Sequence, residues 1–407
     1  MTTPQTYHIF GQTLATSLSP TLHNAAFAHH RLPHHYTIQE CPSLAAVQHL
    51  INAPTFGGAS VTMPHKLAAF PLCDAVSDAA RQIGAINTLI AETRDGKRVI
   101  TGDNTDWRGL YELVVEYLAG CLSSSRDDEV GAGGGPATSL NPGLTSRKTG
   151  LVLGAGGAAR AAVYALLQAN FARIVVANRT VDKAGTIVRD FEGLAGPNGA
   201  TCELVAVEYP IPAVERVRPD VVIGTVPGDV VVEADVEGLF AGQEHEHGHG
   251  LVVEMAYKPR VTGLMRAGQQ AGWEVQDGLE VLLRQGFVQY SLWTGREAPV
   301  EVMRGSIEGE DPTSPTPPPT ALTPSSASAI ERENSSIDNH PSNLSSFKNA
   351  LAPSTTGRYT RPSPAQTRTI SHSDSSSSSP ADPPGAADGH GRDGGDAGHG
   401  GWLWDFS

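Results

Sequence analysis

The chain has 407 residues and a formal net charge of -14 at pH 7, which argues against a general binder of nucleic acid or of anionic membranes, because the average field repels both. Its four cysteines are widely spaced and form no CxxC pair, so neither a disulfide framework nor a zinc site is indicated. No window approaches the roughly 20 apolar residues of a membrane span, and the N-terminus does not resemble a signal peptide. We therefore expect a soluble, cytoplasmic protein, with its oligomeric state left open.

Short apolar segments alternate with helix-like stretches from Tyr7 onward. The segments "YHIFG", "GASVT" and "INTLIA" are typical of strands and "PTLHNAAFAHHR" of a helix, which predicts an α/β domain with a largely parallel sheet. The stretch "DWRGLYELVVEYL" carries apolar residues at i, i+3, i+4, i+7 and i+8, the pattern of an amphipathic helix. We expect this helix to close a first lobe that spans residues 1–119.

The composition then changes three times along the chain. Residues 120–148 are rich in Gly, Ser and Asp and are expected to form a flexible insertion. A second lobe of Rossmann type is expected over residues 149–275, with strands in "GLVLG", "ARIVVANRT", "PDVVIGTV" and "GLVVEMAY". A helix within residues 276–303 is expected to complete the first lobe. Residues 304–407 are so rich in Pro, Ser, Gly and Asp that they cannot bury enough apolar surface to offset the entropy of ordering, which predicts a disordered tail.

A glycine turn in the second lobe predicts a dinucleotide cofactor. Gly154, Gly156 and Ala159 fit the pattern G-x-G-x-x-G/A between a strand and a helix, the context that makes this pattern informative. The turn lets the backbone approach a pyrophosphate, which the N–H groups at the start of the helix then bind. We expect the cofactor to contact Gly154, Ala155, Gly156, Gly157 and Ala158.

The end of the next strand predicts which dinucleotide is bound. An enzyme that prefers NAD would carry an acidic residue there, to bind the ribose 2′-hydroxyl. This chain instead carries two cations and two polar side chains, which suit a 2′-phosphate: Asn178, Arg179, Thr180 and Lys183. The sequence therefore favours NADP over NAD.

Lys66 lies among several polar motifs that end strands or open helices in the first lobe: "SLS", "SVT", "GAINT" and "GDNTDWRG". In open α/β sheets ligands bind beyond the carboxyl ends of strands, so these motifs describe a polar pocket with Lys66 and Asp106 as its titratable members. A ketone that is reduced by a nicotinamide needs a proton for the developing alkoxide, and an ammonium group can stabilise and then protonate that oxygen. Beside it, His65 is expected to point away from the pocket.

These motifs, together with "GAGGAAR", "NRT", "EMAYKP" and "DGLEVLLRQG", occur in the order found in shikimate dehydrogenases. Over residues 7–303 the chain resembles that family, and the residues of its motifs are most similar to those of the dehydrogenase domain at the end of the fungal pentafunctional aromatic-biosynthesis polypeptide. The resemblance implies that residues 1–119 bind substrate, that residues 149–275 bind NADP, and that 3-dehydroshikimate and NADPH give shikimate and NADP.

The resemblance also implies roles for individual residues. Lys66 and Asp106 would form the catalytic pair. The residues that would bind the ring hydroxyls and carboxylate, or lie beside them, are Ser17, Ser19, Thr62, Asn87, Tyr257 and Gln285. Met255 and Gly278 would approach the nicotinamide, and Thr225 would line the cofactor site. Ser60 stands where many bacterial members carry Asn.

Two alternatives to shikimate oxidation remain at the sequence level. One is a quinate dehydrogenase of the same fold, and the other is a non-catalytic regulator that senses quinate or shikimate. The regulator is disfavoured because the chain keeps Lys66, Asp106 and the glycine turn. The segment "HEHGHG", with His245, His247 and His249, could bind a transition metal through its imidazoles, but it lies in a Gly-rich loop without a fixed scaffold, so we expect no functional metal site.

Overall fold

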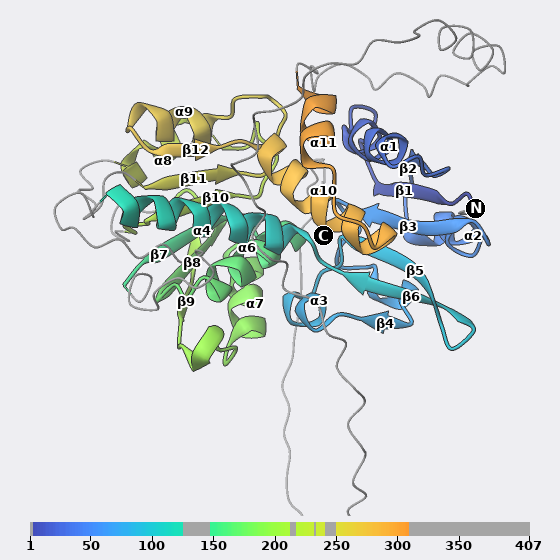
Figure 1. The fold of residues 1–407 in the computed structure, drawn as a ribbon. Coiled ribbons are helices and arrows are strands. Elements are labelled where there is room, and N and C mark those ends of the chain that lie inside the picture. Colours follow the sequence, from blue (N-terminus) through green and yellow to red (C-terminus); the bar gives the residue numbers. More distant parts are fainter. Residues whose placement is uncertain (1–2, 125–146, 212–216, 232, 241–249, 309–407) are drawn as a thin grey trace, which may run out of the picture. The chain divides into compact units, whose positions relative to one another are not determined.

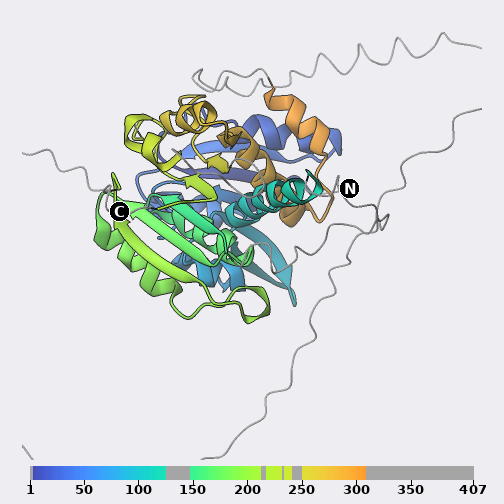
Figure 2. The same cartoon turned by 90° about the vertical axis from the view of Figure 1, so that its left-hand side faces the viewer.

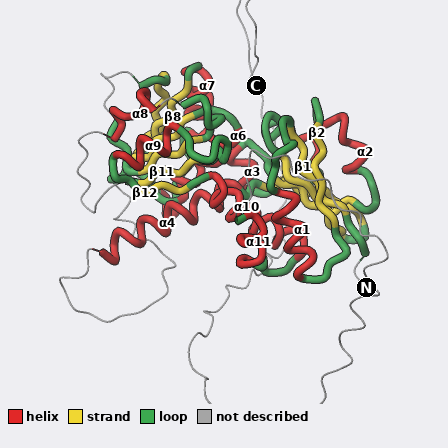
Figure 3. The backbone as a smooth tube through the Cα atoms, turned by 90° about the horizontal axis from the view of Figure 1, so that it is seen from above, coloured by secondary structure: helices red, strands yellow, loops and turns green. Residues whose placement is uncertain are grey.

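The computed structural model describes residues 3–124, 147–211, 217–231, 233–240 and 250–308. These residues form two six-stranded sheets with helices packed on them (Figure 1). The backbone tube in Figure 3 shows the strands gathered into two separate groups. The α/β fold with a Rossmann-type second lobe is therefore confirmed.

The first sheet has the strand order β2-β1-β3-β5-β6-β4. Its strands are β1 (Thr6–Gly11), β2 (His35–Glu40), β3 (Phe56–Val61), β4 (Ala75–Val76), β5 (Thr88–Arg94) and β6 (Lys97–Asp103), and its helices are α1 (Ser19–His29), α2 (Gln48–Ile51) and α3 (Asp78–Ile83), with short 3-10 turns at Leu44–Val47 and Phe70–Leu72. Strand β3 is buried along its whole length, which explains why "FGGASV" is a continuous apolar and small-residue run.

The expectation of a largely parallel first sheet is only partly correct. Strands β1, β2 and β3 pair in parallel, but β5 is antiparallel to both β3 and β6. Asp95 and Gly96 lie between β5 and β6 with φ angles of 50° and 74°, as a tight hairpin turn requires. This Asp-Gly pair makes β6 return beside β5 instead of crossing over.

The second sheet is parallel throughout, with the order β12-β11-β10-β7-β8-β9 (Figure 2). Its strands are β7 (Thr149–Leu153), β8 (Arg173–Asn178), β9 (Glu203–Glu208), β10 (Val221–Gly224), β11 (Leu251–Glu254) and β12 (Glu274–Gln276), and its helices are α6 (Gly157–Gln168), α7 (Val181–Phe191), α8 (Glu233–Phe240) and α9 (Gly263–Gln270), with a 3-10 turn at Pro197–Gly199. Alternate residues of β7 face opposite sides: Val152 packs with residues of α6 and α7, whereas Leu151 and Leu153 pack with residues of α8 and α9. Helices therefore cover both faces.

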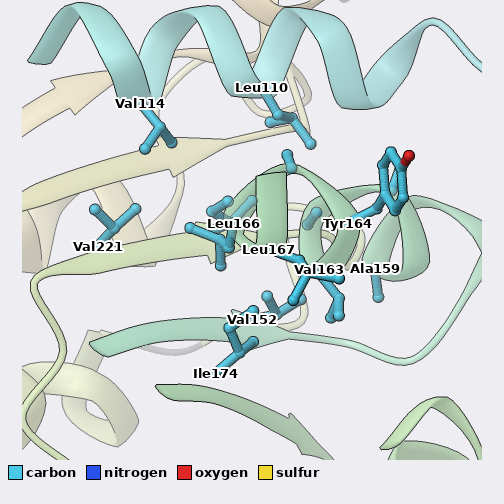
Figure 4. Packing of buried hydrophobic residues seen from close by; sticks show 14 of the residues in the cluster. Leu110, Val114, Val152, Ala159, Val163, Tyr164, Leu166, Leu167, Ile174 and Val221 are labelled. Atoms are coloured by element: carbon cyan, nitrogen blue, oxygen red, sulfur yellow. The ribbon is translucent and has the colours of Figure 1, made fainter. Parts of the chain in front are cut away.

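We expected helix α4 (Asp106–Ser124) to close the first lobe, and it packs both against α10 (Gly278–Thr294), the helix expected to complete that lobe, and against α6. Its apolar side, including Leu110 and Val114, joins the core cluster of the second sheet, beside Val163 and Leu166 of α6 (Figure 4). The amphipathic pattern predicts the apolar face of a helix but not the layer that covers it, and here α6 supplies buried apolar side chains to that layer. The helix also runs to Ser124, five residues beyond the expected end of the lobe at residue 119.

The helix expected within residues 276–303 is two helices, α10 (Gly278–Thr294) and α11 (Val300–Ile307). Gly295 ends α10 with φ of 65°, a left-handed conformation that favours glycine. The tail was expected to begin at residue 304, but Ile307 is 2% exposed and packs with Tyr290 and Met303. The packed chain therefore continues at least to Ile307.

Several sequence expectations fall outside the described residues: most of the insertion, the segment with His245, His247 and His249, and the tail from residue 309. Among the residues that are described, no helix combines the length and the apolar composition needed to cross a membrane.

Candidate active site

Lys66 and Asp106 form an ion pair. The Lys66 Nζ lies 2.6 Å from Asp106 Oδ2, and the two side chains are 15% and 7% exposed. Lys66 lies five residues after β3 ends, and Asp106 is the first residue of α4. Low exposure strengthens the attraction between the two charges and fixes the direction in which the ammonium group points.

Asn87 holds the second oxygen of the Asp106 carboxylate. Its Nδ2 donates to Asp106 Oδ1 at 2.8 Å, while its Oδ1 accepts from the backbone N–H of Thr105 at 2.7 Å. Because a backbone N–H can only donate, this contact determines which end of the Asn87 amide faces the carboxylate. Each oxygen of Asp106 therefore has its own donor.

Three further predicted side chains lie together around the start of α1. Ser17 is buried just before the helix, and Ser19 is its first residue. The Tyr257 side chain is brought to Ser17: burial raises the pKa of the Tyr257 hydroxyl above its ordinary value, and the hydrogen bond between Tyr257 and Ser17 opposes that rise. Tyr257 thus lies beside Ser17, and the backbone N of Ser19 lies 3.4 Å from Ser17 Oγ.

Gln285 and Thr62 complete the predicted substrate side. Gln285, in α10, is buried and its Oε1 accepts from Thr105 Oγ1 at 3.3 Å, so it adjoins the Asn87 group. Thr62 follows β3 directly, and its N–H donates to the carbonyl of Phe10 at 2.9 Å.

His65 is not a rival to Lys66 for acid–base chemistry. Its Nε2 lies 2.9 Å from the carbonyl oxygen of Cys41, and its side chain is buried. The ring is therefore anchored to the backbone.

The glycine turn between β7 and α6 has the shape that a pyrophosphate needs. Gly154 has φ of 118°, and a Cβ placed on it would lie 2.4 Å from Thr225 Oγ1. A Cβ on Gly156 would meet nothing within 4 Å, and one on Gly157 would lie 2.8 Å from Cβ of Lys66. Gly157, Ala158 and Ala159 open α6, where backbone N–H groups have no acceptor within the helix. These features fit a dinucleotide. The pyrophosphate would approach the backbone at Ala155 and Gly156.

The four residues expected at the 2′-phosphate lie at the end of β8 and at the start of α7. Asn178 ends the strand and its Nδ2 donates to the Thr180 carbonyl at 2.9 Å, which closes the turn into α7. Arg179 and Lys183 are exposed beside this turn. Gly154 N–H donates to the carbonyl of Ala177 at 2.8 Å, so the glycine turn and the cationic turn are adjacent.

The remaining cofactor candidates follow neighbouring strands of the second sheet. Thr225, after β10, donates through Oγ1 to the Leu153 carbonyl at 2.7 Å. Met255 follows β11, and the Glu254 carboxylate beside it accepts from Ala256 N–H and Thr262 Oγ1, each at 2.9 Å. Burial raises the pKa of Glu254, and these hydrogen bonds oppose the rise. Gly278 begins α10 so close to Ala256 that a Cβ on it would lie 2.5 Å from that carbonyl oxygen.

Three family models match the chain: the shikimate dehydrogenase substrate binding domain over residues 9–89, shikimate / quinate 5-dehydrogenase over residues 137–200, and the shikimate 5'-dehydrogenase C-terminal domain over residues 278–308. The chain is also 34% identical over 301 residues to the pentafunctional AROM polypeptide of Schizosaccharomyces pombe. It belongs to the shikimate dehydrogenase family.

This shikimate dehydrogenase family member covers only part of its fungal relative. The match takes in 74% of the chain and 18% of the S. pombe polypeptide. A solved structure of the dehydroquinate dehydratase and shikimate dehydrogenase from S. pombe AroM matches 75% of the chain and 53% of its own length, with 34% identity and a TM-score of 0.56.

Bacterial shikimate dehydrogenases match at nearly full length. The Mycobacterium tuberculosis structure is 27% identical, with a TM-score of 0.57, and the match covers 75% of this chain and all of that one. The Thermus thermophilus structure, solved with NADP(H) and shikimate, is 26% identical, with a TM-score of 0.53, and the match covers 75% and 98%. A nicotinamide cofactor is thus part of the family's chemistry.

In this family member, the structure adds polar residues that the sequence reasoning did not place in the site. Thr88 and Thr105 stand inside the motifs "GAINT" and "GDNTDWRG", and both are fully buried beside Asn87. Gln289 lies one helical turn after Gln285 in α10 and is 1% exposed. The sequence could have indicated Gln289, because residues four apart share a helix face and Gln289 lies four residues after Gln285.

Proposed function

We propose that the protein catalyses the reversible, NADP-dependent reduction of 3-dehydroshikimate to shikimate. The observation that carries the proposal is the 2.6 Å ion pair between Lys66 and Asp106, in a chain of the shikimate dehydrogenase family. The pair supplies a proton donor whose direction is fixed, and it adjoins a turn that fits a dinucleotide.

Lys66 handles the proton in this proposal. In the reduction its ammonium group stabilises the carbonyl oxygen as negative charge develops there, and then donates a proton to it. In the oxidation the neutral amine takes the proton from the hydroxyl group. Asp106 holds the amine in place through Oδ2, and Asn87 holds Asp106 through Oδ1. A bound nicotinamide supplies the hydride in one direction and accepts it in the other.

The polar groups around the ion pair orient the ring. We assign the hydroxyls of Ser17 and Ser19, with Tyr257 beside them, to the carboxylate end of the substrate. Thr62, Asn87 and Gln285 are assigned to its hydroxyl groups. Support comes from three contacts, Asn87 with Asp106, Gln285 with Thr105 and Tyr257 with Ser17, and from the T. thermophilus relative solved with shikimate.

The second lobe binds NADP in this proposal. Gly154 to Ala158 contact the pyrophosphate, Arg179 and Lys183 pair with the 2′-phosphate, and Asn178 and Thr180 shape that turn. Met255, Gly278 and Thr225 lie toward the nicotinamide. Support comes from the cationic turn after β8, where an NAD enzyme would carry an acidic residue, and from the relatives solved with NADP.

Quinate is the second candidate substrate, because one matching family model covers shikimate and quinate dehydrogenases together. The test is to measure initial rates for shikimate and quinate, each with NADP and with NAD. We expect shikimate with NADP to give the highest kcat/KM. A higher kcat/KM for quinate would reassign the substrate, and the absence of turnover in all four reactions would favour a non-catalytic regulator.

A further inference from the structure

A buried row of hydrogen bonds begins at Tyr36, on β2. The Tyr36 hydroxyl donates to Ser60 Oγ at 2.7 Å, and Ser60 Oγ donates to Gln289 Oε1 at 2.9 Å. Tyr36 and Gln289 are each 1% exposed, and Ser60 is 6% exposed. The row therefore joins β2, β3 and α10 out of contact with solvent.

The row continues from Gln289 to the residue that holds Asp106. Gln289 Nε2 donates to Thr88 Oγ1 at 2.9 Å and lies 3.4 Å from the Asn87 carbonyl oxygen. Thr88 Oγ1 donates to Asn87 Oδ1 at 2.7 Å. Asn87 Nδ2 then donates to Asp106 Oδ1 at 2.8 Å. Every step is at ordinary hydrogen-bond length.

The row has one direction. Each hydroxyl accepts from the residue before it and donates to the residue after it, and each amide accepts at its oxygen and donates at its nitrogen. The row ends on a carboxylate, which only accepts when ionised. Hydrogen bonds arranged in this way polarise one another, so a break in the middle weakens the last donor as well.

We propose that Gln289 is a positioning residue for the catalytic pair: through Thr88 it fixes the amide of Asn87, and Asn87 fixes Asp106 against Lys66. The inference rests on the proposed function and deepens it. Gln289 links β3 to β5, because its amide oxygen accepts a hydrogen bond from Ser60 and its amide nitrogen donates one to Thr88.

The same row reaches the other end of the proposed substrate site. A hydrogen bond between Tyr36 and Ser19 acts on the pKa of the Tyr36 hydroxyl, which burial raises well above its ordinary value. Tyr36 therefore contacts a residue that we assign to the carboxylate end, while Asp106 contacts Lys66. Gln289 sits between the two ends and sets their relative placement.

The test compares Gln289→Met with Tyr290→Phe. Methionine keeps the length of the side chain but loses the hydrogen bonds to Ser60, Thr88 and the Asn87 carbonyl, so we expect kcat for shikimate to fall roughly 10- to 100-fold, the scale of a misplaced catalytic group. KM for NADP should stay unchanged. Tyr290 is the neighbouring buried residue, and its hydroxyl contacts Ala26 of α1 and His30 just after that helix, outside the row. Tyr290→Phe should lower Tm and leave kcat unchanged.

Thr88 provides a second test that does not depend on the folding of the glutamine variant. Thr88→Val keeps the shape and removes the hydroxyl, so kcat should fall as in Gln289→Met, and Thr88→Ser should recover most of the loss. Wild-type kcat in Gln289→Met, or equal kcat in Thr88→Val and Thr88→Ser, would overturn the positioning role alone. A wild-type protein that does not oxidise shikimate would overturn the proposed function and this role with it.

Discussion

At the scale of single residues, His23 places a titratable ring against Tyr36, the first member of the hydrogen-bond row. It is fully buried in α1, and its ring stacks on Tyr36 with centroids 4.8 Å apart and contacts Trp293 at 4.9 Å. Burial lowers its pKa to about 3, so the ring stays neutral at physiological pH. His23 therefore places no positive charge beside Tyr36 in the hydrogen-bond row.

A neutral buried histidine makes stability depend on pH. Below the ordinary pKa of 6.5, the unfolded chain binds a proton at His23 that the folded protein does not, so stability falls as the pH falls toward the folded-state pKa. Between pH 7 and pH 5 this histidine should cost about 2 kcal/mol of unfolding free energy. His23→Phe removes the titration but keeps an aromatic ring on Tyr36.

Urea unfolding of both proteins at the two pH values measures this effect. The wild type should lose about 2 kcal/mol more than His23→Phe on acidification, and any constant packing cost of phenylalanine cancels in the comparison. Equal losses would mean that His23 is protonated within the fold.

The sequence could predict the residues that stand in strand-end motifs. Lys66, Asp106 and Asn87 each follow or open an element, and in an α/β sheet such positions converge. Ser60 and Gln289 could not be placed in the same way, because Ser60 lies inside a buried strand and Gln289 inside a helix. Only the packing of α10 on β3 and β5 brings these two polar side chains together.

At the scale of elements, the turn between β8 and α7 is the segment that we expect to distinguish NADP from NAD. Arg179→Gln should remove a charge-assisted hydrogen bond to the 2′-phosphate, worth about 1.5 to 3 kcal/mol. We expect KM for NADP to rise roughly 10- to 100-fold and KM for NAD to change little.

Arg189→Gln is the matched control, because it removes the same charge from the last turn of α7, where Arg189 contacts Thr186 at 3.0 Å. It should leave both cofactors unaffected. If Arg179→Gln raised KM for NADP and for NAD equally, Arg179 would not bind the 2′-phosphate.

The elements themselves were easier to predict than their neighbours. Periodicity gives α4 its apolar face, and β-branched runs give β8, β10 and β11, because these depend on local spacing. Whether α4 covers the first sheet or the second depends on contacts with α6, which lies about 50 residues away in sequence. The antiparallel pairing of β5 with β3 likewise joins segments that are not adjacent in sequence, whereas the Asp95–Gly96 turn sets only the hairpin of β5 and β6.

At the scale of the whole molecule, the packed chain reaches Ile307. Every residue assigned to the site lies between Ser17 and Gln289, so truncation after Glu308 should preserve kcat/KM for shikimate and Tm. Truncation after Arg304 should lower Tm by several degrees, because it removes Ile307, whose burial is worth roughly 1.5 to 3 kcal/mol. Thermal melts of the two truncations decide this, and a large Tm loss in the longer one would mean that residues beyond 308 contribute to the packed structure.

We propose that the first lobe supplies the proton and the second holds the cofactor, with Lys66 beside Gly157 where the two lobes meet. The most direct measurement is kcat for shikimate oxidation with NADP in wild type and in Lys66→Ala. We predict that kcat falls by roughly 10² to 10⁴, the usual span for a positioned general acid or base, while KM for shikimate changes far less. Near-normal kcat in Lys66→Ala would exclude Lys66 as the group that transfers the proton.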